Sequence, residues 1–274
     1  MVKDSIEAAA QIIAKAKYAI AYTGAGISAE SGIPTFRDPG GIWDRFDPGE
    51  IGTTGGLVEF AMHHPERIRD FLRESVATFE KADPNPGHYG LVELEEMGIL
   101  RSVVTQNIDD LHSIAGNTRV FEVHGNLYRF RCTSCDWMEK YNREEILGKV
   151  KSVLDAEPFS LQGLLEGIPK CDCMSLMRPD VVMFGEAVQQ LAESYGEAQR
   201  SDVIIVLGTS GAVWPAAEIP YEGRRTKSKI IEINPTENAF REITDVYIQD
   251  LSGMAMPKII ERVRDLLGEG GSQG

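Results

Sequence analysis

The 274-residue chain lacks any apolar run near the length of a membrane span, which needs about 20 residues. Its amino-terminal stretch carries polar side chains every few positions, so the uninterrupted apolar core of a secretory signal is also missing. These absences argue against membrane and secreted proteins. We therefore expect a cytoplasmic protein with no membrane partner.

Basic residues are scarce in this sequence. Lys and Arg together number 28 against 42 Asp and Glu, which gives a formal net charge of -14 at pH 7. A field of that sign repels phosphate backbones, so we expect no direct nucleic-acid binding. Lysine-rich protein segments would instead be attracted.

Cysteine is also rare, with four residues arranged as Cys132-x-x-Cys135 and Cys171-x-Cys173. Disulfides are disfavoured in a cytoplasmic chain, and two close pairs are typical of tetrahedral zinc held by four thiolates. Such a site has no open position, so the zinc would be structural. The alternatives are a redox pair at Cys132 and Cys135, or ordinary buried thiols. The second pair is tighter than the usual C-x-x-C.

The stretch that organises the chain begins with an apolar run of strand length, Tyr18–Tyr22. Three small residues follow at the G-x-G-x-x-G/A spacing of dinucleotide-binding turns, namely Gly24, Gly26 and Ala29. A helix beginning near Ile27 would direct its positive end at a pyrophosphate. A tight strand-to-helix turn without a ligand would leave the same pattern. The Gly- and Pro-containing stretch beyond it predicts a loop that covers a ligand.

Strands and helices alternate along the rest of the chain, with small or polar residues after each strand. This alternation predicts an α/β fold with a Rossmann-like, doubly wound parallel sheet. We expect the large domain in three stretches, 1–40, 82–125 and 178–274. Two insertions, a helical one at 41–81 and a zinc-binding one at 126–177, would form a smaller lobe.

Polar side chains follow two predicted strands, at the edge where ligands bind in such sheets. Asn107 and Asp109 offer donor and acceptor groups that suit a carboxamide, but both would also suit the capped start of a helix. His124 follows the next strand. A histidine there can take a proton from a hydroxyl, and the residues alone make a structural role equally plausible.

These motifs together resemble the sirtuins, which are NAD-dependent protein-lysine deacylases. The segment GAGISAESGIPTFR, which ends at Arg37, is similar to the family's signature, and the resemblance extends to about Asn234. Further motifs follow in the family's order: Thr105–Asp109, Val123–Gly125, the cysteine pairs, Phe184–Glu186 and Gly208–Ser210.

The resemblance implies a reaction. The acetyl oxygen of an acetyl-lysine attacks C1′ of the nicotinamide ribose as nicotinamide leaves. His124 then helps a ribose hydroxyl to attack the resulting imidate, and water completes deacetylation to give O-acetyl-ADP-ribose. The partners would be acetylated lysine peptides or proteins, NAD would be consumed, and one zinc ion would be structural.

The resemblance also assigns roles to individual residues, with His124 and Asn107 as the catalytic ones. The NAD-binding set would be Gly24, Ala25, Gly26, Ile33, Phe36, Arg37, Gln106, Asn107, Ile108, Asp109, His124, Gly208, Thr209, Ser210 and Asn234. A peptide would insert as a strand between two edges and contact Val182, Phe184, Gly185, Glu186, Ala212 and Val213, with Leu72 near the acyl group. The zinc ligands would be Cys132, Cys135, Cys171 and Cys173.

Acyl preference can also be inferred from the resemblance. Sirtuins that prefer succinyl- or malonyl-lysine are similar to one another in a Tyr-x-x-Arg pair, which falls here at Leu72 and Ser75. Neither side chain can meet a terminal carboxylate, so we expect deacetylation to exceed desuccinylation. The alternatives are an ADP-ribosyltransferase, a deacylase of longer chains, and a non-catalytic NAD or ADP-ribose sensor. His124 argues against the sensor, which needs no base.

Overall fold

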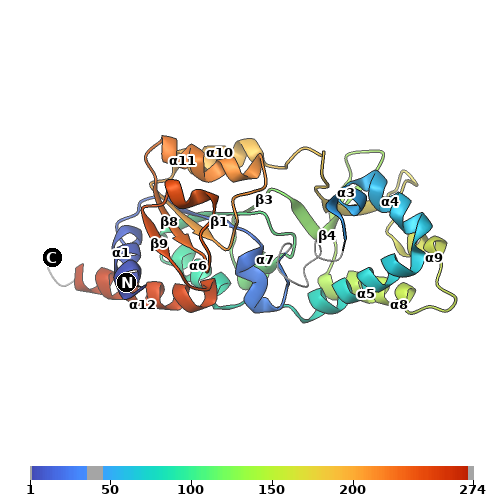
Figure 1. Ribbon diagram of the computed structural model, residues 1–274, viewed down its shortest axis with the longest axis horizontal. Coiled ribbons are helices and arrows are strands. Elements are labelled where there is room, and N and C mark those ends of the chain that lie inside the picture. Colours follow the sequence, from blue (N-terminus) through green and yellow to red (C-terminus); the bar gives the residue numbers. More distant parts are fainter. Residues whose placement is uncertain (1, 36–45, 271–274) are drawn as a thin grey trace.

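The structure is a computed structural model that describes residues 2–35 and 46–270. Two unequal lobes lie side by side along the long axis (Figure 1). The larger contains a six-stranded parallel sheet in the order β3-β2-β1-β7-β8-β9, and the smaller a three-stranded antiparallel sheet in the order β5-β4-β6. The strands are β1 (Ala19–Thr23), β2 (Leu100–Thr105), β3 (Val120–Glu122), β4 (Gly125–Cys132), β5 (Met138–Lys140), β6 (Met177–Val181), β7 (Val203–Leu207), β8 (Lys229–Ile233) and β9 (Val246–Ile248).

The central strands of the large sheet are apolar because helices cover both of its faces. Every residue of β1 and β7 is buried, as expected for parallel strands enclosed on both sides. One face packs against α1, α6 and α12, and the other against α10 and α11 (Figure 1). These helices are α1 (Val2–Ile13), α6 (Pro86–Glu96), α10 (Leu191–Arg200), α11 (Ile219–Arg225) and α12 (Ser252–Gly270). The predicted doubly wound fold is confirmed.

The strands of the large sheet end in one row. Thr23 of β1 pairs with Thr105 of β2 on one side and with Leu207 of β7 on the other. The row continues to Glu122 of β3 and Ile233 of β8. The residues that follow this row therefore lie along a single carboxyl edge. The strand order reverses between β1 and β7, which is where doubly wound sheets bind their ligands.

The smaller lobe packs helices against its own sheet. Tyr128 and Phe130 of β4 are buried with Val76 of α5 and Leu154 of α8. A second apolar cluster, centred on Phe60, joins α3, α4 and α5. The remaining helices are α3 (Pro48–Ile51), α4 (Thr54–His63), α5 (Pro65–Lys81), α7 (Leu111–Ala115), α8 (Arg143–Leu154) and α9 (Leu161–Gly167).

The turn after β1 differs from the sequence prediction. The helix expected near Ile27 is the 3-10 helix η1 (Ala25–Ser31), with no α-helix in its place. Gly32 ends it in the left-handed conformation at φ 85°, and Pro34 follows two residues later. A short 3-10 helix aligns few peptide dipoles, so the dipole argument for phosphate binding is weak here. The other 3-10 helices are η2 (Ala216–Glu218) and η3 (Ala239–Glu242).

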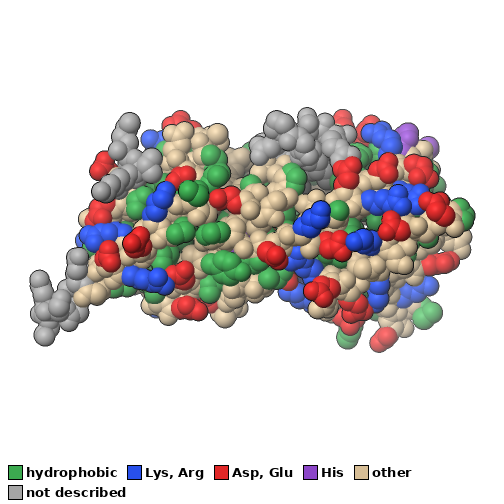
Figure 2. Space-filling view, turned by 90° about the horizontal axis from the view of Figure 1, so that it is seen from below, with side chains coloured by type: hydrophobic (Ala, Val, Ile, Leu, Met, Phe, Trp, Pro, Cys, Tyr) green, Lys and Arg blue, Asp and Glu red, His purple; other side chains and the backbone are tan. Residues whose placement is uncertain are grey.

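Charged side chains of both signs share the surface. On the face shown in Figure 2, acidic and basic groups are interspersed, and no broad basic stripe is visible there. Neighbouring helices carry ion pairs of this mixed kind, such as Arg264 of α12 with Glu93 of α6 at 2.6 Å. Within residues 2–35 and 46–270, no helix is both long and apolar enough to span a membrane.

Candidate active site

Two small-residue turns meet at the carboxyl edge, where the strand order reverses. The Gly26 amide donates to the Gly208 carbonyl at 2.7 Å, and the Gly24 amide donates to the Leu207 carbonyl at 3.1 Å. A Cβ atom at Gly26 would lie 2.7 Å from Gly208 Cα, closer than real side chains come. The glycine spacing thus serves the packing of one turn on the other. Both amides are paired with backbone carbonyls of the neighbouring turn.

A buried serine links the two side chains predicted to hold a carboxamide. Ser28 donates from Oγ to Asp109 Oδ2 at 2.6 Å and accepts from Asn107 Nδ2 at 3.0 Å. The other carboxylate oxygen of Asp109 accepts from the Leu111 amide at 3.0 Å. Burial raises the pKa of the Asp109 carboxyl, and the two hydrogen bonds that it accepts oppose this rise. Asn107 and Asp109 are therefore held in fixed orientations.

A layer of hydroxyl groups supports this arrangement from within the sheet. Thr23 donates from Oγ1 to Thr105 Oγ1 at 2.8 Å, and Thr105 Oγ1 accepts from the Asn107 amide at 3.0 Å. The His112 Nε2 atom lies 2.9 Å from Thr23 Oγ1. Since these groups are all buried, each bond also satisfies a polar atom that water does not reach. The layer fixes the backbone at Asn107.

Two buried histidines lie next to each other behind the site. The ring centroids of His88 and His112 are 4.9 Å apart. Burial lowers the pKa of His88 to about 2 and that of His112 to about 4. Histidine in an unfolded chain titrates near 6.5. As the pH falls below 6.5 the unfolded chain therefore binds more protons than the folded one, and stability that is complete above 6.5 is lost.

We expect the free energy of unfolding to fall between pH 6.5 and 5, by about 1–2 kcal/mol for each buried histidine. His88→Gln should remove the part of this pH-dependent loss that His88 causes. The variant should still fold, because glutamine can replace the ring in the capping contact with the Asn85 amide. Urea unfolding at pH 6.5 and pH 5 measures how steeply the unfolding free energy changes with pH, which is the slope compared below. The control is His63→Gln, which alters an exposed histidine and should leave the slope unchanged. An unchanged slope in His88→Gln would contradict this account.

His124 follows β3 at the same edge and is half-buried. Its Nδ1 lies 3.1 Å from the Gln106 carbonyl, which can only accept a hydrogen bond, so the proton is on Nδ1. Among the residues that the structure describes, Nε2 has no hydrogen-bond partner. Burial lowers the pKa of His124, and the bond to Gln106 acts in the opposite direction. The geometry leaves a neutral ring with a free lone pair on Nε2, as a general base requires.

The end of the site under β7 and β8 is held by amide side chains. Gln106 donates from Nε2 to Thr209 Oγ1 at 2.9 Å. Asn234 and Asn238 both donate to the Thr209 carbonyl, at 2.8 and 2.6 Å. Ser210, next in the chain, is exposed at the rim. Asn238 lies beyond the motif that ends at Asn234, so no motif in the sequence marks it.

One of the two edges predicted to receive a peptide adjoins His124. The Val182 amide donates to the His124 carbonyl at 2.9 Å, and the Phe184 amide donates to the Gly52 carbonyl at 2.8 Å. Gly185 turns the chain at φ 88°. On the other edge Ala212 is exposed and Val213 is half-buried. The first edge is thus bonded directly to His124, and the second is open to solvent at Ala212.

The Glu186 carboxylate is held by several donors of the smaller lobe. It accepts two hydrogen bonds from Arg178, at 2.6 and 2.7 Å, and one from Arg131 at 3.1 Å. Thr54 of α4 donates to it at 3.2 Å, as does the Met183 amide. Burial raises the pKa of this carboxyl, but Arg178 and the Met183 amide together hold it below the usual value. This carboxylate thus ties the turn to the smaller lobe.

Other predicted residues are placed as follows. Ile33 and Ile108 are half-buried near the edge, and the Ile108 carbonyl accepts from the Leu127 amide at 2.9 Å. Leu72 of α5 is partly buried against both apolar clusters of the smaller lobe. Phe36 and Arg37 lie outside the described residues.

The four cysteines converge at one end of β4 and β6. Their Sγ atoms all lie within 4.8 Å of one another. The Cys132–Cys173, Cys135–Cys171 and Cys135–Cys173 sulfur distances are 3.5, 3.6 and 3.9 Å. A tetrahedral zinc with Zn–S bonds of about 2.3 Å sets its sulfur atoms about 3.8 Å apart. The donor set fits zinc, and the tight C-x-C pair brings both of its sulfurs into the cluster.

Comparison with known proteins identifies the family. The Sir2 family model matches residues 24–215. The chain belongs to the Sir2 family. It is 48% identical, over 96% of its length, to the NAD-dependent protein deacylase of Desulfosudis oleivorans, of which it covers 97%. A Sir2 homologue solved with NAD is 38% identical, with a TM-score of 0.76 and coverage of 94% of this chain and 93% of that one.

A further solved sirtuin, bound to a myristoylated histone peptide, is 36% identical, with a TM-score of 0.72 and coverage of 97% of this chain and 99% of that one. The resemblance found in the motifs is confirmed. This sirtuin is an NAD-dependent protein deacylase. Its cysteine cluster is able to hold the expected structural zinc ion.

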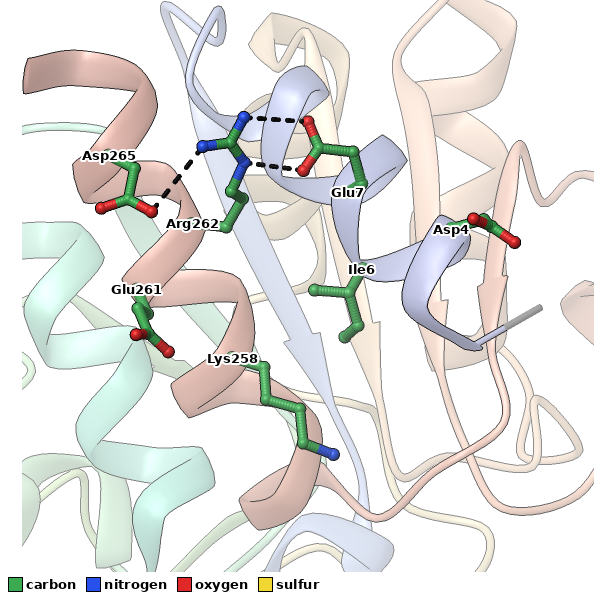
Figure 3. Close-up of a pocket in the computed structure, with 7 residues that line it drawn as sticks. All are labelled: Asp4, Ile6, Glu7, Lys258, Glu261, Arg262 and Asp265. Atoms are coloured by element: carbon green, nitrogen blue, oxygen red, sulfur yellow. Dashed lines mark hydrogen bonds and ion pairs between the residues drawn. The ribbon is translucent and has the colours of Figure 1, made fainter. Parts of the chain in front are cut away.

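A hollow of about 530 Å³ lies elsewhere on the sirtuin, between α1 and α12 (Figure 3). Its lining is mostly charged, and Arg262 crosses it to bind Glu7 at 2.6 and 3.3 Å and Asp265 at 3.7 Å. The pair with Glu7 joins the first helix to the last, whereas Asp265 lies one turn along the same helix as Arg262. The hollow contains none of the residues described above, and we assign it no part in catalysis.

Proposed function

We propose that this sirtuin deacetylates acetyl-lysine in protein segments and transfers the acetyl group to ADP-ribose with release of nicotinamide. The observation that carries the proposal is His124, which presents a free Nε2 at the sheet edge shared with Asn107 and Asp109. The NAD complex of one homologue and the acylated histone peptide of another support the choice of substrates.

Each group at the edge then has one task. Asn107 and Asp109, oriented by Ser28, bind the carboxamide of nicotinamide, and Ile108 lies between them. Ala25, Gly26 and Ile33 serve the phosphates and the reacting ribose, as do Phe36 and Arg37 by their place in the motif. Gly208, Thr209, Ser210 and Asn234 serve the adenosine half. The departing nicotinamide already carries positive charge, so orientation and exclusion of water are the main demands. His124 accepts the proton of the ribose hydroxyl at Nε2.

One incubation tests the proposal. The protein is mixed with NAD and an acetyl-lysine peptide, and the products are followed by mass spectrometry. Loss of the acetyl group with formation of O-acetyl-ADP-ribose is expected. Gain of ADP-ribose on a protein without loss of acetyl would favour an ADP-ribosyltransferase. An unchanged peptide and intact NAD would favour a sensor, and either result would overturn the proposal.

A finer proposal concerns which acyl group is removed, and it rests on Leu72 and Ser75 of α5. Leu72 packs among apolar side chains, and the Ser75 hydroxyl donates to the Phe71 carbonyl at 2.8 Å within α5. Neither provides a phenol or a cation for a terminal carboxylate. An unpaired buried carboxylate costs several kcal/mol, which strongly suppresses such a substrate. An apolar Leu72 suits acetyl and is compatible with longer hydrocarbon chains.

We expect kcat/KM for acetyl-lysine to exceed that for succinyl-lysine on the same peptide by at least about 10-fold, the equivalent of 1.4 kcal/mol. Leu72→Tyr combined with Ser75→Arg should shift the ratio toward succinyl, and Leu72→Met with Ser75→Ala is the matched apolar control. A myristoyl-lysine peptide tests the longer-chain alternative. A succinyl value equal to the acetyl one in the parent protein would refute the pocket argument.

A further inference from the structure

A tryptophan at the end of one peptide edge is unusually exposed. Trp214 directly follows Ala212 and Val213, and it is 60% exposed. Water contact over a ring of this size is costly, and tryptophan is more often found largely buried. An exposed aromatic residue beside a binding edge is therefore a candidate contact for what binds there.

The ring nevertheless has a fixed position. Trp214 stacks on Tyr221 with ring centroids 6.2 Å apart and an interplanar angle of 27°. Tyr221 packs on Phe240 at 5.7 Å, and Phe240 meets Tyr22 of the central strand edge-on at 6.0 Å. The Tyr221 hydroxyl donates to the Ala239 carbonyl at 2.9 Å. This aromatic column connects the exposed ring to the core, so a partner that contacts it need not order it first.

The charge around the column is acidic. The Glu242 carboxylate lies 3.2 Å from the Tyr221 hydroxyl oxygen, and Glu218 and Glu222 lie in the first turn of the helix that carries Tyr221. Glu218 and Glu222 share a single cation, Arg225. The other cations nearby, Arg224 and Arg241, pair with further carboxylates, Asp245 and Glu237. Over the whole chain, carboxylates outnumber cations. A tryptophan face in an acidic setting favours a cation, and the guanidinium of arginine is the side chain that stacks best on it.

We propose that the Trp214 ring binds a basic side chain next to the acyl-lysine, so that arginine-flanked acyl-lysine peptides are preferred substrates. The proposal rests on the deacetylase function given above. The contact is a cation–π interaction at a partly exposed site, which corresponds to a preference of about 2–5-fold. The peptide backbone supplies most of the affinity, and Trp214 adds discrimination between substrates.

The test uses acetyl-lysine peptides that carry one arginine at each of the two positions before and after the lysine. Partner peptides carry citrulline, which keeps the shape without the charge, or norleucine, which is apolar. We expect kcat/KM for arginine over citrulline to be about 2–5 at one position or more in the parent protein. Trp214→Leu should bring this ratio close to one, and Trp214→Phe should keep part of it. Any general loss of activity cancels in the ratio.

Ionic strength separates the contact from the long-range field of the acidic chain. Salt screens the long-range field, so the part of the arginine-to-citrulline ratio that the field causes should be lost at high salt in every variant. A ratio of one at all positions, an equal ratio in Trp214→Leu, or a norleucine peptide at least as good as the arginine one would overturn the proposal.

Isothermal titration calorimetry of the same peptides tests the Trp214–arginine contact separately from the deacetylase function. Trp214-dependent tighter binding of arginine peptides without deacetylation would sustain the contact and overturn the function. Deacetylation without an arginine preference would sustain the deacetylase function and overturn the Trp214 contact.

Discussion

His124→Ala should lower kcat for deacetylation by about 10²–10⁴-fold, because it removes the group that accepts the ribose hydroxyl proton. The ring lies at the sheet edge, and its Nδ1 is held by the Gln106 carbonyl. No buried ion pair is broken by the change, so the thermal unfolding temperature and most NAD binding should persist. Steady-state kinetics and calorimetric titration with NAD measure the two effects. His63→Ala, which alters an exposed histidine of α4, is the control.

The pH profile gives an independent check on the same residue. The base must be neutral, and burial holds the pKa of His124 below its ordinary value. The rate should therefore rise from acid pH through a pKa below 6.5 and be level at pH 7. A His124 variant that turned over acetyl-peptide at the parental rate would refute this mechanism.

The large sheet could be predicted because its strands are encoded locally. Val203–Leu207, for example, is apolar throughout, and such a run by itself predicts a strand that is buried on both faces. Parallel strands also end together, so the polar residues after them meet without any knowledge of tertiary contacts. Asn107 and His124 could be found in this way.

Other features depend on pairs that are distant in the sequence. Ser28 bonds to Asp109 across 81 positions, and Gly26 fits against Gly208 through backbone approach alone. No local spacing records such a pair. The only local signal for Ser28 was a hydroxyl inside a glycine-rich turn, which has many uses. The bond from Arg131 to Glu186 likewise spans 55 positions, and no local pattern marks it.

Zinc removal should have the largest effect on stability. The cysteine cluster closes a lobe whose apolar core, around Tyr128, Phe130 and Met177, is small. Structural zinc contributes on the order of 10 kcal/mol to the folding of such modules. We expect one zinc per chain, a markedly lower unfolding temperature after treatment with a strong chelator, and an indirect loss of activity. Metal analysis and calorimetry measure these changes.

Substitution of single ligands tests the coordination itself. Cys173→Ser removes one thiolate of the tight pair and should lower zinc content and unfolding temperature together. Ser134→Ala alters an exposed residue between Cys132 and Cys135 and should change neither. In the folded protein, thiol reagents should find no reactive cysteine until zinc is withdrawn, because a metal-bound thiolate is shielded. Fresh, unchelated protein without zinc, or with four reactive thiols in the folded state, would show that the cluster is not a metal site.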